Sequence, residues 1–408
     1  MKGPGLFAGF GLELEYMLVD AGSLAVLPKV DQLLAAAAGA EVADEVERGA
    51  FAWSNELALH VVEIKNREPV PELAGLEEGL QAEVRALAGQ AAALGGRLLP
   101  SGMHPWMDPV RETRLWPHGQ QEIYRAYHRI FGCQGHGWGN LQSVHLNLAF
   151  QGDTEFARLH AGLRLLLPLM PALAASSPFV EGRPAGRLDS RLGFYRENQR
   201  RIPAIIGQVV PEPVYSQAAY EAEILAATYR QIRPFDPAGL LQHEWLNSRG
   251  VIARFERSAL EVRVLDIQEC PLADVSIAVA IVAVLRALVA ERWSDWASQA
   301  AMPTESLARL FHQAVDEADG LVIRDRDYLD LLGCTGTGAV TAAEVWGEML
   351  ALAVPPEPYR GTVARMLRRG PLARRLLRAA GPEPSRAVLV DLYRELADCL
   401  AAGELFRA

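Results

Sequence analysis

Lysine is nearly absent from this chain, which has 408 residues and 40 residues of the Lys and Arg types. Its only lysines are Lys2, Lys29 and Lys65, so 37 of the 40 basic residues are arginines. A phosphate-binding loop of the GxxxxGKS/T type needs a lysine directly before serine or threonine. None of the three lysines has that neighbour, so any bound nucleotide must be held by arginines and metal ions instead.

Cysteine is also rare, and its spacing excludes two classes of site. The four cysteines lie far apart in the sequence and form no CxxC pair: Cys133, Cys270, Cys334 and Cys399. This spacing argues against a disulfide framework and against a zinc site built from thiolates. Near the start of the chain, Glu13 and Glu15 interrupt the apolar stretch that a secretory signal needs. The cytoplasm is therefore the expected compartment.

An excess of positive charge is missing as well. Asp and Glu number 50 against 40 basic residues, a net charge of −10, so no global basic field exists to hold nucleic acid. Half of the residues are hydrophobic, which is typical of a globular protein. The best candidate for a membrane span, residues 275–290, contains Arg286 and falls short of the roughly 20 apolar residues required. It predicts a buried helix and no membrane partner.

Hydrophobic periodicity divides the chain into a mixed part and a helical part. Alternation predicts strands within the first 20 residues and at 97–100, 141–150 and 250–266, and helical spacing predicts helices at 71–94, 121–131 and 154–176. After Pro271 the predicted elements are helices, at 273–292, 304–317, 341–352 and 385–401. We therefore expect an α+β body at residues 1–295 and a helical C-terminal region at residues 296–408.

The first candidate for chemistry is the run at residues 11–16, with the sequence GLELEY. The two-residue period of a strand places Glu13 and Glu15 on one face and the apolar side chains on the other. Two carboxylates so arranged either hold cations or face water on the polar side of an edge strand. The run alone leaves both interpretations open.

Two later strands show the same division into a polar and an apolar face. One places Ser143, His145 and Asn147 together, and these are ligand-type side chains. The other places Glu261 beside Arg263, a pair that can contact a cation and grip a phosphate or carboxylate. The alternatives are a histidine satisfied by its surroundings and a cross-strand salt bridge.

Two further segments are less regular. Between Glu56 and Lys65, Glu63 shares its parity with apolar residues, which requires a bulge or a strand buried on both faces. A later loop carries Arg187 and Arg191, which are candidates for clamps on phosphate or carboxylate. A solvated basic loop is the alternative.

The pattern that these strands share is more informative than any one of them. Each has an apolar face and a face that carries Glu, His or Arg, so a single concave sheet would gather a carboxylate-rich cation site bordered by arginine. Oxygen-dominated ligation suits Mg²⁺ or Mn²⁺ rather than structural zinc. Phosphoryl transfer from ATP needs such a site, since cations bridge the phosphates and offset charge in the transition state.

Five segments in order resemble the glutamate–cysteine ligase superfamily, in particular the branch with the plant-type enzymes and the bacterial carboxylate–amine ligases. They are GLELEY at 11–16, VVEIKN at 61–66, SVHLNLAF at 143–150, SSPFVEGRPAGRLDSR at 176–191 and LEVRVLDIQ at 260–268. The resemblance covers residues 6–295. It implies a glutamine-synthetase-like fold, in which a curved, mostly antiparallel sheet forms a catalytic cradle flanked by helices. ATP would enter one side of the cradle and the amino-acid substrates the other.

The resemblance also implies roles for individual residues. Metal ions that bridge ATP would be held by Glu13, Glu15, Glu63, His145 and Glu261. Arg263, paired with Glu261, would face the transferred phosphate as part of the catalytic machinery. The arginine that matches Arg191 would lie near the nucleotide or a substrate carboxylate. From their loop and strand face, we also expect Arg187 and Asn147 to take part in cofactor binding.

The expected function is that of an ATP-dependent carboxylate–amine ligase that acts through an acyl phosphate. The family favours the γ-carboxylate of glutamate as the donor and cysteine as the acceptor, a reaction of glutathione biosynthesis with Mg²⁺ or Mn²⁺ as cofactor. A ligase with another amine acceptor is one alternative. A divalent-metal protein that uses the same cradle without ATP is the other. In each case the partners are small molecules.

Overall fold

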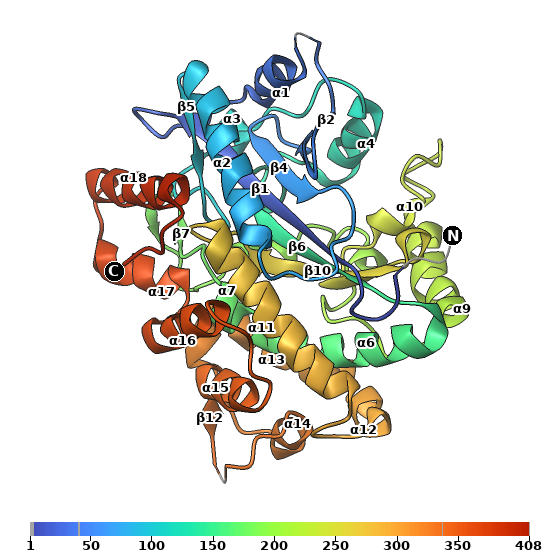
Figure 1. The fold of residues 1–408 in the computed structure, drawn as a ribbon. Helices are drawn as coiled ribbons and strands as arrows, with labels where there is room; N and C mark the ends of the chain where they lie inside the picture. Colours follow the sequence, from blue (N-terminus) through green and yellow to red (C-terminus); the bar gives the residue numbers. More distant parts are fainter. Residues whose placement is uncertain (1–3, 40, 337, 408) are drawn as a thin grey trace.

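The computed structural model describes residues 4–39, 41–336 and 338–407. Within these residues, eight antiparallel strands form one sheet, in the order β2-β3-β4-β1-β6-β10-β9 with β5 paired to β1 (Figure 1). The strands are β1 (Phe10–Asp20), β2 (Glu45–Arg48), β3 (Phe51–Asn55), β4 (Val61–Asn66), β5 (Gly96–Leu99), β6 (Ser143–Ala149), β9 (Val251–Arg254) and β10 (Ala259–Asp266). The predicted α+β class with an antiparallel sheet is confirmed.

Strand β1 lies in the middle of the sheet and fixes its register. Glu13 is opposite Lys65 of β4 and opposite His145 of β6, and Glu15 is opposite Glu63 of β4. Because neighbouring side chains on a strand point to opposite faces, the even-numbered residues of β1 share the other face. Those residues are fully buried, as the alternation predicts: Leu12, Leu14, Tyr16 and Leu18.

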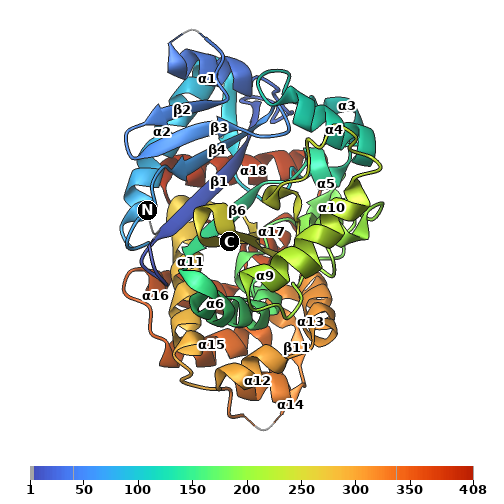
Figure 2. The same cartoon turned by 90° about the vertical axis from the view of Figure 1, so that its right-hand side faces the viewer.

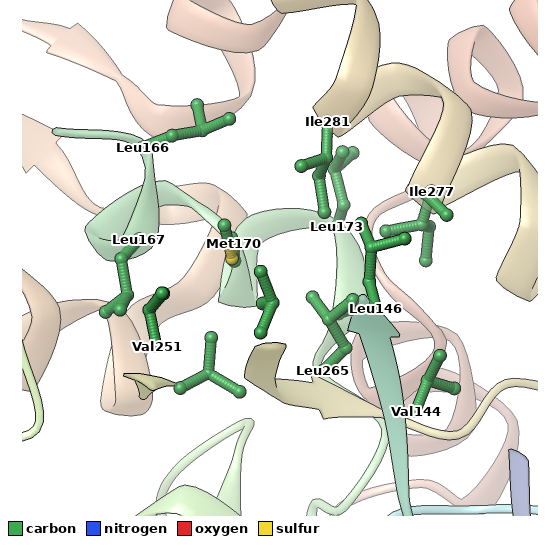
Figure 3. Packing of buried hydrophobic residues seen from close by; sticks show 14 of the residues in the cluster. Val144, Leu146, Leu166, Leu167, Met170, Leu173, Val251, Leu265, Ile277 and Ile281 are labelled. Atoms are coloured by element: carbon green, nitrogen blue, oxygen red, sulfur yellow. The ribbon is translucent and has the colours of Figure 1, made fainter. Parts of the chain in front are cut away.

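Two long helices cover the apolar face of the sheet. Helix α2 (Leu76–Ala93) and helix α11 (Pro271–Val289) both lie in front of the strands in Figure 1. Figure 3 shows Leu146 of β6 and Leu265 of β10 packed near Ile277 of α11. Helix α11 is long and apolar enough to cross a membrane, but 78% of its most apolar window is buried inside the protein. The predicted buried helix is confirmed.

The polar face of the sheet is enclosed from the other side. Helices α4 (Gln121–Phe131), α5 (His136–Gly139) and α10 (Ala226–Ile232) lie on that side, and Figure 2 shows the strands between them and α11. The predicted helix at 121–131 is α4, and its bounds agree. The polar residues of the strands therefore face an interior space rather than bulk solvent.

The C-terminal region is mostly helical, as predicted, and packs on the same core as α11. Its elements are α12 (Trp296–Ala301), α13 (Thr304–Glu317), β11 (Val322–Ile323), α14 (Arg326–Leu331), β12 (Val340–Thr341), α15 (Ala342–Leu352), α16 (Tyr359–Arg369), α17 (Leu372–Ala380) and α18 (Arg386–Ala402). Trp346 and Met366 are buried in the cluster that also holds Ile277. Helices α12, α14, α16 and α17 were not predicted. Two of them, α12 and α14, have only six residues each, too few to show a helical period.

Two predicted elements differ from the structure. The helix expected at 154–176 is divided into α6 (Gly152–Leu166), a 3₁₀ turn (Leu167–Leu169) and α7 (Pro171–Ala174). Proline lacks the N–H that a helix interior requires, and both breaks coincide with Pro168 and Pro171. The irregular segment before Lys65 becomes a strand only from Val61. The first four residues of this strand are buried, whichever face they point to. A strand buried on both faces was one of the two structures expected for this segment.

Candidate active site

Polar side chains from four neighbouring strands share the enclosed face of the sheet. The strands β4, β1, β6 and β10 are adjacent in this order, so residues that are far apart in the sequence meet across it. The predicted residues brought together there are Glu13, Glu15, Glu63, Ser143, His145, Asn147, Glu261 and Arg263. The structure thus joins the separate polar faces into one surface.

His145 connects the two carboxylates of β1. Its Nδ1 lies 2.9 Å from Oε2 of Glu13, and its Nε2 lies 3.8 Å from Oε1 of Glu15. Ser143 donates from its backbone N–H and its hydroxyl to Oε2 of Glu15, at 2.8 and 3.0 Å. Asn147 donates to Oε1 of Glu13 at 3.1 Å. These bonds fix the orientation of both carboxylates.

Two overlapping groups of side chains have the composition of a divalent-cation site. One atom each of Glu13, Glu63 and His145 lie within 4.8 Å of one another, and so do single oxygens of Glu15, Glu56 and Glu63. Five ligand groups, four of them carboxylates, suit hard cations such as Mg²⁺ or Mn²⁺. The residues present therefore fit the cofactor that the sequence predicts.

Glu56 is the functional candidate that the sequence did not identify. It directly follows β3 in the connection to β4, outside any strand, so strand periodicity did not give the direction of its side chain. The only signal was the presence of a second carboxylate seven residues before Glu63. This connection places Glu56 next to Glu63 and Glu15.

The carboxylates differ strongly in their affinity for protons. Burial acts to raise the pKa of Glu13, but the hydrogen bond and charge of His145, with Lys65 and Arg263, outweigh it and hold the pKa at about 2. Burial and the charges of Glu13 and its neighbours raise the pKa of Glu63 to about 7, despite the opposing effect of Lys65. Burial and the same acidic neighbours raise the pKa of Glu56 well above its usual range. The pKa values of Glu56 and Glu63 are raised because the cluster holds more negative charge than its basic neighbours balance. A bound cation would supply the missing positive charge.

The raised pKa of Glu63 predicts that pH controls the effect of added cations on stability. Between the usual carboxyl pKa of 4.5 and about 7, the folded protein holds a proton that the unfolded chain has released. The stability of the metal-free protein should therefore fall as pH rises through this window. Since Mg²⁺ or Mn²⁺ replaces that proton, either ion should raise Tm more at pH 8 than at pH 6.

Thermal melts with saturating cation, and with a chelator, measure this difference at both pH values. The Glu63→Gln variant is the control, because glutamine does not titrate and should make the cation effect less dependent on pH, with Glu56 remaining as a titrating ligand. Equal increases in Tm at pH 6 and pH 8 in the unmodified protein would contradict the assignment of Glu63 as a cation ligand.

Strand β10 carries a bulge at the position of Arg263. Its register with β6 shifts between Val262 and Leu265, so β10 has one more residue than its partner here, and such a bulge redirects side chains. Arg263 contacts one oxygen of Glu261, and Arg254 of β9 contacts the other at 2.8 Å. Burial has the largest influence on the pKa of Glu261 and acts to raise it. The charge of Arg263 has the next largest influence, and the pKa stays below the usual range.

The two arginines predicted from the loop at 176–191 have different surroundings. Arg191 is buried, contacts Asp266 at the end of β10, and donates to the backbone oxygen of Arg263 at 3.3 Å. Arg187 instead lies 3.7 Å from Asp316 of α13 and borders neither of the cavities next to the sheet described below. The structure brings Arg191 to the candidate site but places Arg187 elsewhere.

Two cavities lie on either side of this cluster. The first has a volume of about 510 Å³ and is bordered by Glu13, Lys65, Arg67, Asn147 and Arg257, among others. The second has a volume of about 210 Å³. It is bordered at the sheet by Glu15, Glu56, Ser143, His145, Arg191 and Arg263, and on the opposite side by Tyr124, Tyr127, Trp138, Tyr195 and Trp245. Glu45, Glu47 and Glu68 also border the first cavity. The cation cluster therefore lies between a larger cavity of mixed charge and a smaller, partly aromatic one.

Comparison with known proteins assigns the chain to a family. The family model of glutamate–cysteine ligase family 2 matches residues 9–395. An uncharacterized protein of Archaeoglobus fulgidus is 32% identical over 404 residues, 97% of this chain and 99% of that protein. The chloroplastic glutamate–cysteine ligase of Nicotiana tabacum is 27% identical over 174 residues, 41% of this chain and 32% of that enzyme. Bacterial relatives with a ligase name align over about half of their own length, 46–59%.

Solved structures show the same fold. The glutamate–cysteine ligase of Francisella tularensis, solved in complex with AMP, has a TM-score of 0.59 at 10% identity, covering 98% of this chain and 90% of that chain. A bifunctional glutathione synthetase of Pasteurella multocida has a TM-score of 0.53 at 14% identity, covering 96% of this chain and 52% of the other. The resemblance found in the sequence is confirmed: the chain belongs to glutamate–cysteine ligase family 2.

Proposed function

We propose that this protein is an ATP-dependent ligase that joins the γ-carboxylate of glutamate to the amino group of cysteine. The observation that carries the proposal is the position of the carboxylate cluster between two cavities, with Arg263 at the boundary of the second. A ligase that activates a carboxylate with ATP needs two substrates to meet at one charged centre. Membership of the family supports glutamate as donor and cysteine as acceptor.

The first cavity is the proposed nucleotide site. Three basic residues border it, and Asn147 offers an amide. Lys65 and Arg67 are paired with Glu45 and Glu47 and would have to exchange these partners for phosphate oxygens, whereas Arg257 has no such pair among the described residues. This arrangement agrees with the absence of a lysine-containing phosphate loop from the sequence. The Francisella ligase of the same fold was solved with AMP, which also supports a nucleotide in this protein. The phosphates of ATP would then point toward Glu13.

The second cavity is the proposed site of the amino-acid substrates. Arg191 and Arg263 border its inner end, where they are suited to bind carboxylate and the transferred phosphoryl group. Its aromatic side is suited to the apolar part of a small amino acid. Its volume of about 210 Å³ limits the substrates to small molecules.

The proposed reaction has two steps. An oxygen of the glutamate γ-carboxylate attacks the γ-phosphorus of ATP, and ADP leaves. The neutral amine nitrogen of the acceptor then attacks the carbonyl carbon of the acyl phosphate, phosphate leaves, and the nitrogen loses one proton to solvent as the amide forms. Bound Mg²⁺ would offset the phosphate charge. The residues that would hold the ion are Glu13, Glu15, Glu56, Glu63, His145 and Glu261. Arg263 would donate to the phosphoryl oxygens as their charge develops. The cytoplasm, the expected compartment, would supply the ATP.

A screen of ADP release tests this function and the identity of the acceptor together. The protein, Mg-ATP and glutamate are combined with each common amino acid or amine, and products are identified by mass spectrometry. We expect ADP release with cysteine and a γ-glutamyl amide as product. With ¹⁸O in the glutamate carboxylate, the released phosphate should carry the label, because one carboxylate oxygen stays with phosphorus. Amide product together with unlabelled phosphate would contradict the acyl-phosphate intermediate. If another amine gives faster ADP release, that amine replaces cysteine as the proposed acceptor.

A further inference from the structure

The carboxylate of Asp266 lies at the centre of a buried network behind the second cavity. It accepts from the backbone N–H of Ser176 at 2.9 Å and from the hydroxyl of Ser177 at 2.8 Å. It also accepts from Nε of Arg191. A Cβ atom at Gly102 would lie 2.3 Å from Oδ2 of Asp266, so only glycine leaves room for the carboxylate. Several segments of the chain thus converge on this side chain.

This network occupies one edge of the Arg191 guanidinium and leaves the other edge available. The Nε edge faces Asp266, whereas Nη1 and Nη2 have the backbone oxygen of Arg263 as a distant partner, at 3.3 and 3.4 Å. Arg191 borders the second cavity, although its side chain is only 2% exposed. A guanidinium held along one edge presents its remaining N–H groups in a fixed direction, which suits a carboxylate.

A second acid in the network makes no ion pair among the described residues. Asp189 is fully buried beside Asp266, and its Oδ1 accepts from the backbone N–H of Leu192 at 2.8 Å. Burial and the negative charge of Asp266 raise the pKa of Asp189 well above its usual range, although Arg191 opposes the shift. Of the two acids, Asp266 has the larger electrostatic influence on Arg191, and only Asp266 contacts its guanidinium. This difference provides a matched pair of carboxyl groups for an experiment.

We propose that Asp266 is a positioning residue, which fixes the guanidinium of Arg191 at the end of the second cavity so that it binds the carboxylate of an amino-acid substrate. This role rests on the ligase function proposed above. Asp266 itself does not border the cavity and acts through Arg191. The bulge in β10 is essential to the arrangement, because Asp266 would point to the opposite face of a regular strand.

The test compares the same substitution at the two acids, in the full-length protein with glutamate and ATP. Asp266→Asn removes the charge that orients Arg191, so KM for glutamate should rise about tenfold or more while KM for ATP changes less than about twofold. Asp189→Asn keeps an acceptor for the backbone N–H of Leu192 and leaves the contact between Asp266 and Arg191 in place, so its KM for glutamate should change much less. In an Arg191→Ala background, Asp266→Asn should not raise KM for glutamate further.

Because Asp266→Asn breaks a buried ion pair, it is also expected to lower Tm. Ser177→Ala removes one donor to Asp266 and is the milder variant, with a smaller rise in KM for glutamate and again little change for ATP. A purely structural role predicts lower Tm with both KM values unchanged per folded molecule, and that result would overturn the positioning role. If the unmodified protein releases no ADP with any amine, the ligase function itself fails instead. The two failures are therefore distinguishable.

Discussion

Replacing Glu13 with glutamine is expected to lower kcat by about a hundredfold or more, with the fold preserved. The pKa of Glu13 is held at about 2, so its carboxylate is fully charged at neutral pH and binds a cation without losing a proton. Glutamine has nearly the same size and can still interact with His145, but it carries no charge. Steady-state ADP release at saturating Mg²⁺, together with a thermal melt, measures both parts of this prediction.

The control for Glu13→Gln is Glu83→Gln. Glu83 is a similarly buried carboxylate, 14% exposed against 18% for Glu13, and it pairs with Arg48 on the covered side of the sheet. The substitution at Glu83 should leave kcat unchanged and alter only stability, by about 1 kcal/mol or less. Near-normal turnover in Glu13→Gln at saturating Mg²⁺ would remove Glu13 from the proposed cation site.

Replacing Arg263 with lysine is expected to lower kcat by about tenfold to a hundredfold, more than it raises KM for ATP. Lysine retains the charge but loses the planar pair of donors that matches a phosphoryl group. If Arg263 interacts more strongly as charge develops on that group, the loss falls on the transition state rather than on nucleotide binding. A mainly raised KM for ATP would instead indicate a contact with the ground state.

Arg254→Lys is the matched control for Arg263→Lys. Both arginines contact Glu261, but only Arg263 borders the second cavity. If Arg263 served only to neutralise Glu261, the two lysine variants should show similar losses of stability and similar kcat. Kinetics and a denaturant melt on both proteins distinguish these cases, and an unchanged kcat in folded Arg263→Lys would remove it from the catalytic residues.

Local sequence periodicity predicted which side chains share a face within each strand. The alternation of Leu12, Glu13 and Leu14 is a property of the backbone, since each strand residue points opposite to its neighbours. The same argument separated Glu261 from Val262, and in both strands the apolar residues are buried. The polar faces of β1, β6 and β10 were therefore identified without knowledge of which strands are neighbours, whereas Glu63 of β4 was indicated only by the family resemblance.

Residues outside regular strands could not be identified in this way. Glu56 lies in the connection between β3 and β4 and Asp266 follows a bulge, so neither obeys the two-residue period that strand prediction assumes. Asp266 has the opposite parity to Glu261 in the sequence, yet the extra residue in β10 brings it to the network that holds Arg191. The same limit applies to Arg187, whose position depends on how its loop packs against α13.

The sequence by itself determined the α+β class, the polar and apolar faces of the strands and the family, because these depend on spacing along the chain. Only the tertiary structure decided that β4, β1, β6 and β10 are neighbours in that order, and that Tyr127 and Trp245 close the second cavity. Strand order and cavity walls arise from contacts between segments far apart in the sequence, such as Glu13 with Lys65 and Glu13 with His145. Such contacts depend on packing of the whole core, so the local spacing of hydrophobic residues does not predict them.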